Sequence, residues 1–480
     1  MPGVAVTETG HRAPPGVETH GVRPVPAEER TTGWHDLFGI LFTANLSPLV
    51  LALGAIAVTA GGLSVWWAAA AIGLGALLGS LIVAVSAQAG VDYGLPGLVA
   101  MRATFGQWGS RGFISPYRVV AVTYWFAAQA LAAAIGVRAI VDVLTGYDVG
   151  FVPASLAVAA IAAMLAIIGF DALRYFVRIV LPLTVIAVVV MIVLFVTTED
   201  PAYSTTEVLS SNELTFTWLG FSVFMTAIWG GQLTSLLSAA DLGRYARSKA
   251  HMRVGIVAGT TAGAFVAAWV GAYAAAAAEK EPSAFAAAAT LTQQKALLAF
   301  LLLVVLANTI SVNVLNLYQG GLALVNSLPR TGRFVSTLLV SIPAVAFAAA
   351  TELIRDAEEW FIHLGNVAAP IAGVVLVDYV LLKRMRIDVA ALFTPDGRYR
   401  YLVGVNPAAA VALVVGVAVY YAVPDSWLKV AWGIVGAGAL YFVGALLQGH
   451  LWPQLRDAVA PAEESADAAD VESPRGETAA

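Results

Sequence analysis

The fold of this chain is decided by residues 36–60, DLFGILFTANLSPLVLALGAIAVTA. The stretch is apolar and long enough to cross a bilayer, yet Asn45-Leu46-Ser47-Pro48 interrupts its centre. Pro48 lacks a backbone N–H and clashes with the preceding turn, so a helix should unwind there. A second apolar stretch, residues 216–238, carries Gly230-Gly231-Gln232, and paired glycines also weaken a helix. We therefore predict two broken helices at matching places in the two halves of the chain.

Breaks of this kind carry a functional meaning. In hydrocarbon, freed backbone groups are tolerated only where they face protein or a water-filled cavity. Transporters use unwound carbonyls and half-helix ends at mid-depth to hold a polar substrate and a coupling cation. The two breaks therefore favour a solute carrier.

Composition supports a membrane protein. The 480 residues are 59% hydrophobic and only 12% charged, and the mean hydropathy is +0.80. Soluble domains are roughly a quarter charged. Apolar runs of spanning length predict twelve transmembrane helices, at about 36–60, 65–88, 116–144, 151–170, 177–198, 215–238, 253–278, 295–326, 334–352, 358–382, 404–422 and 427–448.

Basic residues are divided unequally between alternate loops. One set of loops contains sixteen, namely Arg102, Arg111, Arg118, Arg174, Arg178, Arg244, Arg247, Lys249, Arg253, Arg330, Arg333, Lys383, Arg384, Arg386, Arg398 and Arg400. The other set contains five, namely Arg138, Lys280, Lys295, Arg355 and Lys429. Cytoplasmic loops are enriched in Lys and Arg, so the first set is predicted to be cytoplasmic. With twelve spans across the plasma membrane, both termini are then predicted to lie on the cytoplasmic side.

Several other classes of protein are disfavoured. Cysteine is absent, which excludes a disulfide framework and a thiolate metal site. The six histidines are scattered without an H-E-x-x-H pattern, so the chain is not expected to be an enzyme. A channel would favour charge rings or a repeated carbonyl filter. The basic residues are dispersed in short loops, and no nucleic-acid partner is expected. Residues 1–33 and the acidic residues 455–480 are predicted to be disordered tails.

Four segments resemble the nucleobase–cation symporter family, which carries purines, pyrimidines, allantoin and hydantoins. They are Gly94–Gly106 (GLPGLVAMRATFG), Ala240–Arg247 (ADLGRYAR), Asn316–Leu324 (NLYQGGLAL) and Val377-Asp378-Tyr379 with Lys383-Arg384. Their order between the predicted helices matches the family, and the resemblance covers about residues 34–450. The loops that carry Arg102 and Arg244 also fit simple positive-inside anchors.

The resemblance implies an all-α fold. It is a five-plus-five inverted repeat of the leucine-transporter type with helices one and six broken, followed by two extra helices. The first repeat is expected over residues 34–200, the second over 214–384, and the extra helices over 403–450.

A heterocyclic base needs an aromatic face for stacking and amides for its edge. Trp125 and Gln129 lie four residues apart, so they share one helix face. A tryptophan here also suits a lipid-facing position. The resemblance implies that both bind substrate, together with Asn316 and a group near Asn45 and Ser47. At Gly230-Gly231-Gln232 the family has G-G-W, and the resemblance adds Gly231 and Gln232 to the expected substrate site. Gln232 replaces a second stacking ring and is expected to hydrogen-bond the ring edge, and Trp229 is the candidate substitute for that ring. Asn308 and Asn313 are expected to bridge helices.

The resemblance also implies a sodium site. Its carbonyls fall on Thr43, Leu46 and Ala307, and its hydroxyl pair falls on Ile310 and Ser311. Ile310 cannot coordinate a hard cation, which prefers oxygen ligands, so the site is weakened. Ser311 keeps its hydroxyl, and Thr309 is a candidate substitute for the missing one. No carboxylate lies in the middle of helices one, three, six or eight, which leaves no group for proton coupling there. The sequence therefore leaves two candidates for the coupling ion, Na⁺ and H⁺. No other cofactor is expected.

Taken together, the sequence predicts a secondary active transporter in a lipid bilayer. It would import a nucleobase or related heterocycle, a purine, cytosine, allantoin or hydantoin, by cation symport with alternating access. A carrier of another small polar heterocycle, such as a vitamin precursor, is the alternative.

Overall fold

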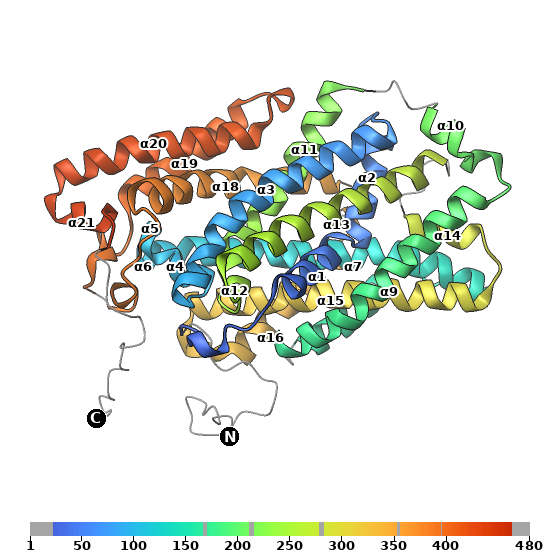
Figure 1. Ribbon diagram of the computed structural model, residues 1–480, viewed down its shortest axis with the longest axis horizontal. Helices are drawn as coiled ribbons and strands as arrows, with labels where there is room; N and C mark the ends of the chain where they lie inside the picture. Colours follow the sequence, from blue (N-terminus) through green and yellow to red (C-terminus); the bar gives the residue numbers. More distant parts are fainter. Residues whose placement is uncertain are drawn as a thin grey trace, which may run out of the picture.

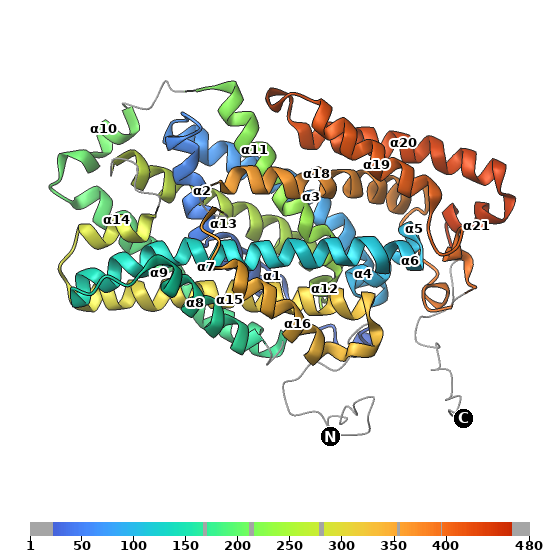
Figure 2. The same cartoon turned by 180° about the vertical axis from the view of Figure 1, so that it is seen from behind.

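The computed structural model describes residues 23–166, 170–210, 216–277, 283–352, 356–394 and 396–462. These residues are helical apart from loops and two isolated β-bridges. The long helices run side by side along the longest axis (Figures 1 and 2). They are α1 Trp34–Asn45, α2 Pro48–Thr59, α3 Val65–Tyr93, α7 Ser115–Thr145, α8 Phe151–Ala166, α9 Phe170–Thr197, α11 Trp218–Leu233, α13 Lys249–Ala277, α15 Lys295–Ser327, α16 Gly332–Phe347, α18 Ala357–Val375, α19 Pro407–Ala422 and α20 Lys429–Leu451.

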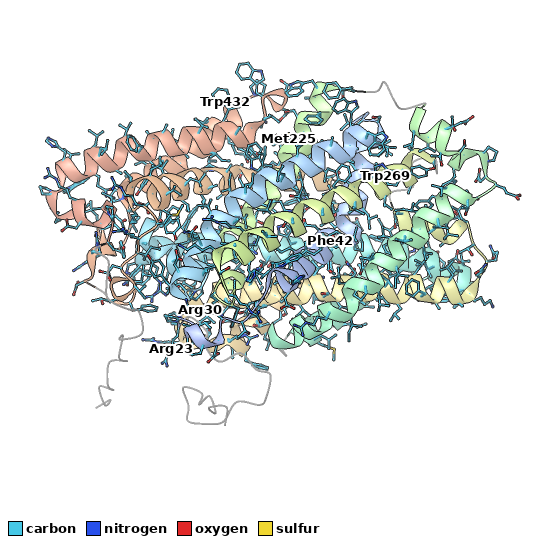
Figure 3. The ribbon with its side chains drawn as sticks, in the orientation of Figure 1. Arg23, Arg30, Phe42, Met225, Trp269 and Trp432 are labelled. Atoms are coloured by element: carbon cyan, nitrogen blue, oxygen red, sulfur yellow. The ribbon has the colours of Figure 1, made fainter. Side chains whose placement is uncertain are left out.

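Many of these helices suit a bilayer. Within the described residues, seven are long and apolar enough to cross a membrane, and α1 with α2 forms one further, bent span. Each of the twelve predicted segments contains a described helix. Large apolar side chains cover the outside, such as Val414 (71% exposed) on α19 and Leu447 (56%) on α20. Trp432 projects outward from α20 in Figure 3. Lipid, unlike water, accommodates such a surface without penalty.

The first predicted break lies where the sequence places it. Helix α1 ends at Asn45, α2 begins at Pro48, and their axes differ by 49°. Ser47 has extended backbone angles, which stop the α1 hydrogen-bond ladder. Pro48 occupies the first turn of α2, where its missing N–H has no cost.

The second break was predicted at the wrong residues. Helix α11 continues through Gly230-Gly231-Gln232 to Leu233, and the irregular part follows as a 3₁₀ turn at Thr234–Leu237 and a kink at Ser238. The glycines serve close packing instead: a Cβ on Gly230 would lie 2.7 Å from the Cα of Gly365 on α18. Tertiary packing thus overrides the low helix propensity of glycine.

Helices from the two halves of the chain pack against one another. Helix α3, the second in the first half, packs against α11 and α13, and α1 also packs against α13. Helix α7 packs against α8 and α15. The core therefore contains two groups of helices, α1–α3 with α11 and α13, and α7–α8 with α15–α16. The substrate residues predicted from the sequence lie where these groups meet.

The short helices α4 Gly97–Ala100, α5 Arg102–Phe105, α6 Gln107–Gly109, α12 Ala239–Gly243 and α21 Arg456–Val459 gather at one end, here called the motif end. Helices α10 Thr205–Ser210 and α14 Ala284–Thr290 lie at the opposite end (Figure 1). The four family-like segments meet at the motif end. Gly97 N donates to Asp241 Oδ1 (2.8 Å), Arg244 donates to the Tyr318 hydroxyl (3.0 Å), and Thr104 donates to Asp378 (2.7 Å).

The two arginines of these segments are not simple surface anchors. Arg244 is fully buried, and Arg102 is 3% exposed and donates to Asn326 Oδ1 and the Leu392 carbonyl. Burial lowers the pKa of the Arg102 guanidinium to about 10, so it keeps its charge at neutral pH.

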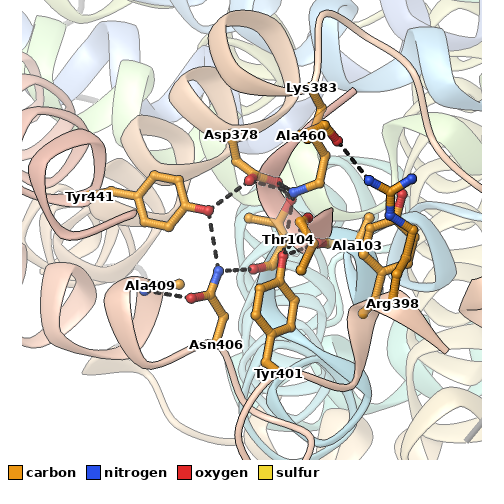
Figure 4. A network of polar contacts seen from close by, with 12 residues as sticks. Ala103, Thr104, Asp378, Lys383, Arg398, Tyr401, Asn406, Ala409, Tyr441 and Ala460 are labelled. Atoms are coloured by element: carbon orange, nitrogen blue, oxygen red, sulfur yellow. Dashed lines mark hydrogen bonds and ion pairs between the residues drawn. The ribbon is translucent and has the colours of Figure 1, made fainter. Parts of the chain in front are cut away.

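A buried ion pair lies at the motif end (Figure 4). Lys383 Nζ lies 2.5 Å and 2.6 Å from the two carboxylate oxygens of Asp378, and both side chains are fully buried. The Tyr441 hydroxyl also donates to this carboxylate, at 2.6 Å. Tyr401 lies beside Lys383, and its hydroxyl donates to the Ala103 carbonyl. One cluster thus joins α5, α20 and the segment after α18.

Parts of both predicted tails pack against the rest of the protein. Residues 23–33 pack against the motif end, where Val25 is fully buried and Arg30 donates to the Val25 and Val91 carbonyls. Figure 3 shows Arg23 and Arg30 there. The backbone of residues 455–462 is held too, because Tyr401 donates to the Ala458 carbonyl. Burial of a few apolar side chains fixes segments that composition assigned to solvent. Residues 1–22 and 463–480 lie outside the described residues.

Candidate functional site

A cavity lies between α1, α3, α7, α11, α13 and α15, beside the break in helix one. Five of the eight residues predicted to bind substrate line it: Asn45, Trp125, Gln129, Gln232 and Asn316. They come from four helices that are distant in sequence. None of the described residues that line the cavity is acidic, and Arg118 is its one basic residue.

Trp125 supplies the aromatic surface of the cavity. Its indole Nε1 donates to Thr234 Oγ1 (3.1 Å), and Phe361 of α18 meets it edge-on with ring centroids 4.6 Å apart. Gly231 makes room for this arrangement, since a Cβ there would lie 2.5 Å from Phe361 Cδ1 and 3.2 Å from Trp125 Cζ2. The indole is therefore held in one orientation, as stacking requires.

Gln129 lies one turn further along α7. Its Nε2 donates to Ser47 Oγ at 3.1 Å, which ties α7 to the break in helix one. Its Oε1 is buried and has no hydrogen-bond partner among the described residues. A buried amide oxygen without a partner is costly, so a ligand N–H that reached it would gain a strong interaction.

Gln232 and Asn45 join the two predicted break regions. Gln232 Nε2 donates to Asn45 Oδ1 at 2.6 Å, and Asn45 Nδ2 donates to the Leu41 carbonyl at 2.9 Å. The cavity therefore has a polar wall where the family carries a second aromatic ring. Trp125 is the only aromatic ring among its described lining residues.

The asparagines of α15 divide into two roles. Asn316 lines the cavity and donates to Asn313 Oδ1 (3.3 Å). Asn313 donates to the Phe126 carbonyl of α7 (3.1 Å), and Asn308 donates to the Thr43 and Leu46 carbonyls of helix one (both 3.1 Å). The prediction that Asn308 and Asn313 bridge helices is confirmed.

Three predicted substrate residues are not among the described residues that line the cavity. Ser47 and Gly231 lie directly behind the lining residues. Ser47 accepts a hydrogen bond from Gln129, and a Cβ on Gly231 would lie 3.2 Å from Trp125 Cζ2. Trp229 is buried at 9% exposure, and its indole N–H has no partner among the described residues. Trp229 belongs to the packed core of α11, so it offers no second stacking face here.

Sequence reasoning missed Arg118 and Gln319, which also line the cavity. Arg118 is 2% exposed, donates to Gln319 Oε1, and donates to the Thr234 carbonyl (3.0 Å), which lies in the irregular part after α11. It was counted only as a loop charge. Its spacing of seven residues from Trp125 places both on one helix face, and this pattern could have revealed it.

The predicted sodium ligands are partly brought together. The Thr43 and Leu46 carbonyls both accept hydrogen bonds from Asn308 of α15. Ser311 follows Asn308 on the same helix and is buried. Ala307 precedes Asn308, and Ile310 is partly exposed. No cluster of three or more His, Asp or Glu side chains occurs in the described part of the chain.

The fold and the cavity define a multi-pass membrane transporter, with a stacking surface and hydrogen-bonding amides but no acid–base pair among the described lining residues. A family model described as "Permease for cytosine/purines, uracil, thiamine, allantoin" matches residues 24–444. The chain belongs to this permease family, which confirms the resemblance to nucleobase–cation symporters.

Individual relatives agree with this assignment. A purine-uracil permease of Arabidopsis thaliana is 42% identical over 60 residues, 12% of this chain and 10% of the relative. A hydantoin permease of Microbacterium maritypicum is 27% identical over 166 residues, 32% of this chain and 34% of the relative. The matched segments thus span about a third or less of these relatives.

Solved structures show the fold. Mhp1, a nucleobase-cation-symport-1 family transporter with bromovinylhydantoin bound, has a TM-score of 0.77 at 20% identity and covers 92% of this chain and 98% of its own. A Na⁺-coupled sialic acid symporter has a TM-score of 0.63 at 12% identity, with 94% of each chain covered. The protein therefore has the leucine-transporter fold.

Proposed function

We propose that this protein imports a nucleobase or a related heterocycle, such as a purine, cytosine, allantoin or a hydantoin, by cation symport. The observation that carries the proposal is the convergence of one indole and five amides on one cavity. The Trp125 ring gives a flat heterocycle a stacking face, and the free Gln129 Oε1 accepts a ring N–H. Membership of the permease family supports the same substrate class.

Alternating access is the proposed mode of transport. The break in helix one and the irregular segment after α11 both border the cavity, so they can act as hinges between the two groups of helices. The proposal includes twelve spanning helices in the plasma membrane and a cytoplasmic motif end with both termini. The excess of Arg and Lys in the loops on that side supports this orientation.

Thermal stabilisation of the purified full-length protein tests the substrate class. A ligand of the folded state raises the melting temperature with the logarithm of its concentration. Nucleobases, allantoin and hydantoins should be compared with thiamine and with an amino acid as a control. Stabilisation by thiamine alone, or by none of these compounds, would contradict the proposal.

Uptake into proteoliposomes tests the mode of transport. Internal unlabelled substrate should accelerate uptake of labelled substrate, because a carrier returns faster when it is loaded. Uptake that does not saturate, together with unitary currents across a planar bilayer, would instead indicate a channel.

A further inference from the structure

The break in helix one leaves two main-chain carbonyls in need of partners. Thr43 lies in the last turn of α1 and Leu46 caps its end, and the extended backbone of Ser47 interrupts the ladder in which the N–H groups of residues 47 and 50 would otherwise bond to these carbonyls. Thr43 is fully buried and Leu46 is 2% exposed, so water does not compensate. In hydrocarbon such carbonyls need a hydrogen-bond donor or a cation.

The Asn308 side chain supplies the donor. Its Nδ2 lies 3.1 Å from the Thr43 oxygen and 3.1 Å from the Leu46 oxygen, and Thr184 Oγ1 of α9 lies at 3.5 Å. An amide nitrogen has two N–H groups, one for each carbonyl. Three oxygens surround this atom, and the nitrogen of the amide faces them favourably, whereas its oxygen would be repelled. Asn308 is 1% exposed, so the arrangement is enclosed.

The same two carbonyls are those expected to hold sodium. A cation bound between them would have to lie where the Asn308 nitrogen lies, and two groups cannot share that space. Ile310 supplies no oxygen, although Ser311 and Thr309, whose hydroxyl has no partner among the described residues, lie beside it on α15. With the Asn308 amide in this position, no room is left for a sodium ion between the two carbonyls.

We propose that the Asn308 carboxamide takes the place of the coupling sodium ion at the break in helix one. The amide then satisfies the Thr43 and Leu46 carbonyls without sodium. This inference rests on the proposed function for its meaning in transport. The amide links α1, α9 and α15 permanently, whereas a bound ion would link them only when sodium is present. Binding of the heterocycle should accordingly be independent of sodium.

The test measures the melting temperature of the purified full-length protein without substrate, with sodium chloride replacing choline chloride at constant ionic strength. The wild-type protein should show no sodium-specific rise. Asn308→Asp keeps the size of the side chain but adds a carboxylate beside two carbonyls and a hydroxyl, an all-oxygen set that suits a hard cation. This variant should show a saturable, sodium-specific rise.

Asn313→Asp is the matched control. Asn313 lies on the same helix, is fully buried and donates to a single carbonyl, that of Phe126, away from the break. It should gain no sodium response, although it should lose stability. An equal response of the two variants to sodium would overturn the proposal, and so would a sodium-specific rise in the wild type.

A wild-type measurement keeps the proposal testable if neither variant folds. The dissociation constant of a stabilising heterocycle should be the same in sodium and in choline, and a tightening by about fivefold or more in sodium would overturn the inference. If no heterocycle binds in either salt, the proposed function fails. The sodium result obtained without substrate stands apart from that outcome.

Discussion

Gln232 on α11 donates a hydrogen bond of 2.6 Å to Asn45 at the end of α1, inside the cavity. The two residues lie beside the break in helix one and the irregular segment after α11, so this contact links the two segments proposed as hinges. Both side chains line the cavity, so a ligand that bonds to either of them competes with the hydrogen bond between them.

Gln232→Ala and Asn45→Ala should therefore weaken heterocycle binding non-additively. Residues in one hydrogen-bond network show coupling energies of about 0.5–3 kcal/mol. Dissociation constants of the two single variants and the double variant measure this directly. Additive losses would show that the two amides contact the ligand independently.

Trp125→Ala and Gln129→Ala should each weaken binding, because one removes the stacking face and the other the free acceptor. The expected loss is about 1–3 kcal/mol, or roughly 5- to 150-fold in affinity. Trp432→Ala is the control, since this indole is 45% exposed on α20. Calorimetry measures the dissociation constant of the heterocycle for all three variants. Unchanged affinity in both cavity variants would place the site elsewhere.

Gly231→Ala should reduce affinity by displacing Phe361 and Trp125, which a new Cβ would meet at 2.5 Å and 3.2 Å. Overpacking of this kind costs about 1–3 kcal/mol, although alanine is the better helix former. Gly112→Ala, whose Cβ meets nothing within 4 Å, controls for the change in backbone entropy. Equal effects of both substitutions on binding would argue against a role for the Trp125 orientation.

Lys383→Met should strongly destabilise the protein, by about 3–5 kcal/mol, because it leaves the fully buried Asp378 carboxylate without its ion-pair partner. The double variant Asp378→Asn/Lys383→Met should recover part of this loss. Melting temperatures in detergent measure both. Arg400→Met breaks the exposed pair with Asp396 and should change stability little.

Single cysteines can map the topology cleanly, because the chain contains none. Cysteine at Asp148, whose side chain is 71% exposed, should react with an impermeant thiol reagent in whole cells. Cysteine at Arg400, whose side chain is 61% exposed near the motif end, should react only after the cells are opened. The reverse pattern would invert the proposed orientation.

Much of the site could be predicted from the sequence. Trp125 and Gln129 share a helix face through their spacing, and the family resemblance implied Asn316 and a group near Asn45 as further substrate residues. Arg118 was not predicted as a cavity residue, because a charged side chain near a helix end is ordinarily assigned to a loop. Trp229 is not among the described residues that line the cavity, because hydropathy does not tell which face of α11 meets it.

The sequence by itself determined where the chain can span a membrane and where helix one must break, because hydropathy and the missing N–H of Pro48 are local properties. Only the tertiary structure decided where helix six ends and what satisfies the opened carbonyls. Gly230 and Gly231 stay helical because α18 packs against them, and the break moves to Thr234, whose carbonyl Arg118 satisfies. Likewise, Asn308 reaches Thr43 from 265 residues away. A helix end is stable wherever partners for its free groups lie in space, and no local pattern records that.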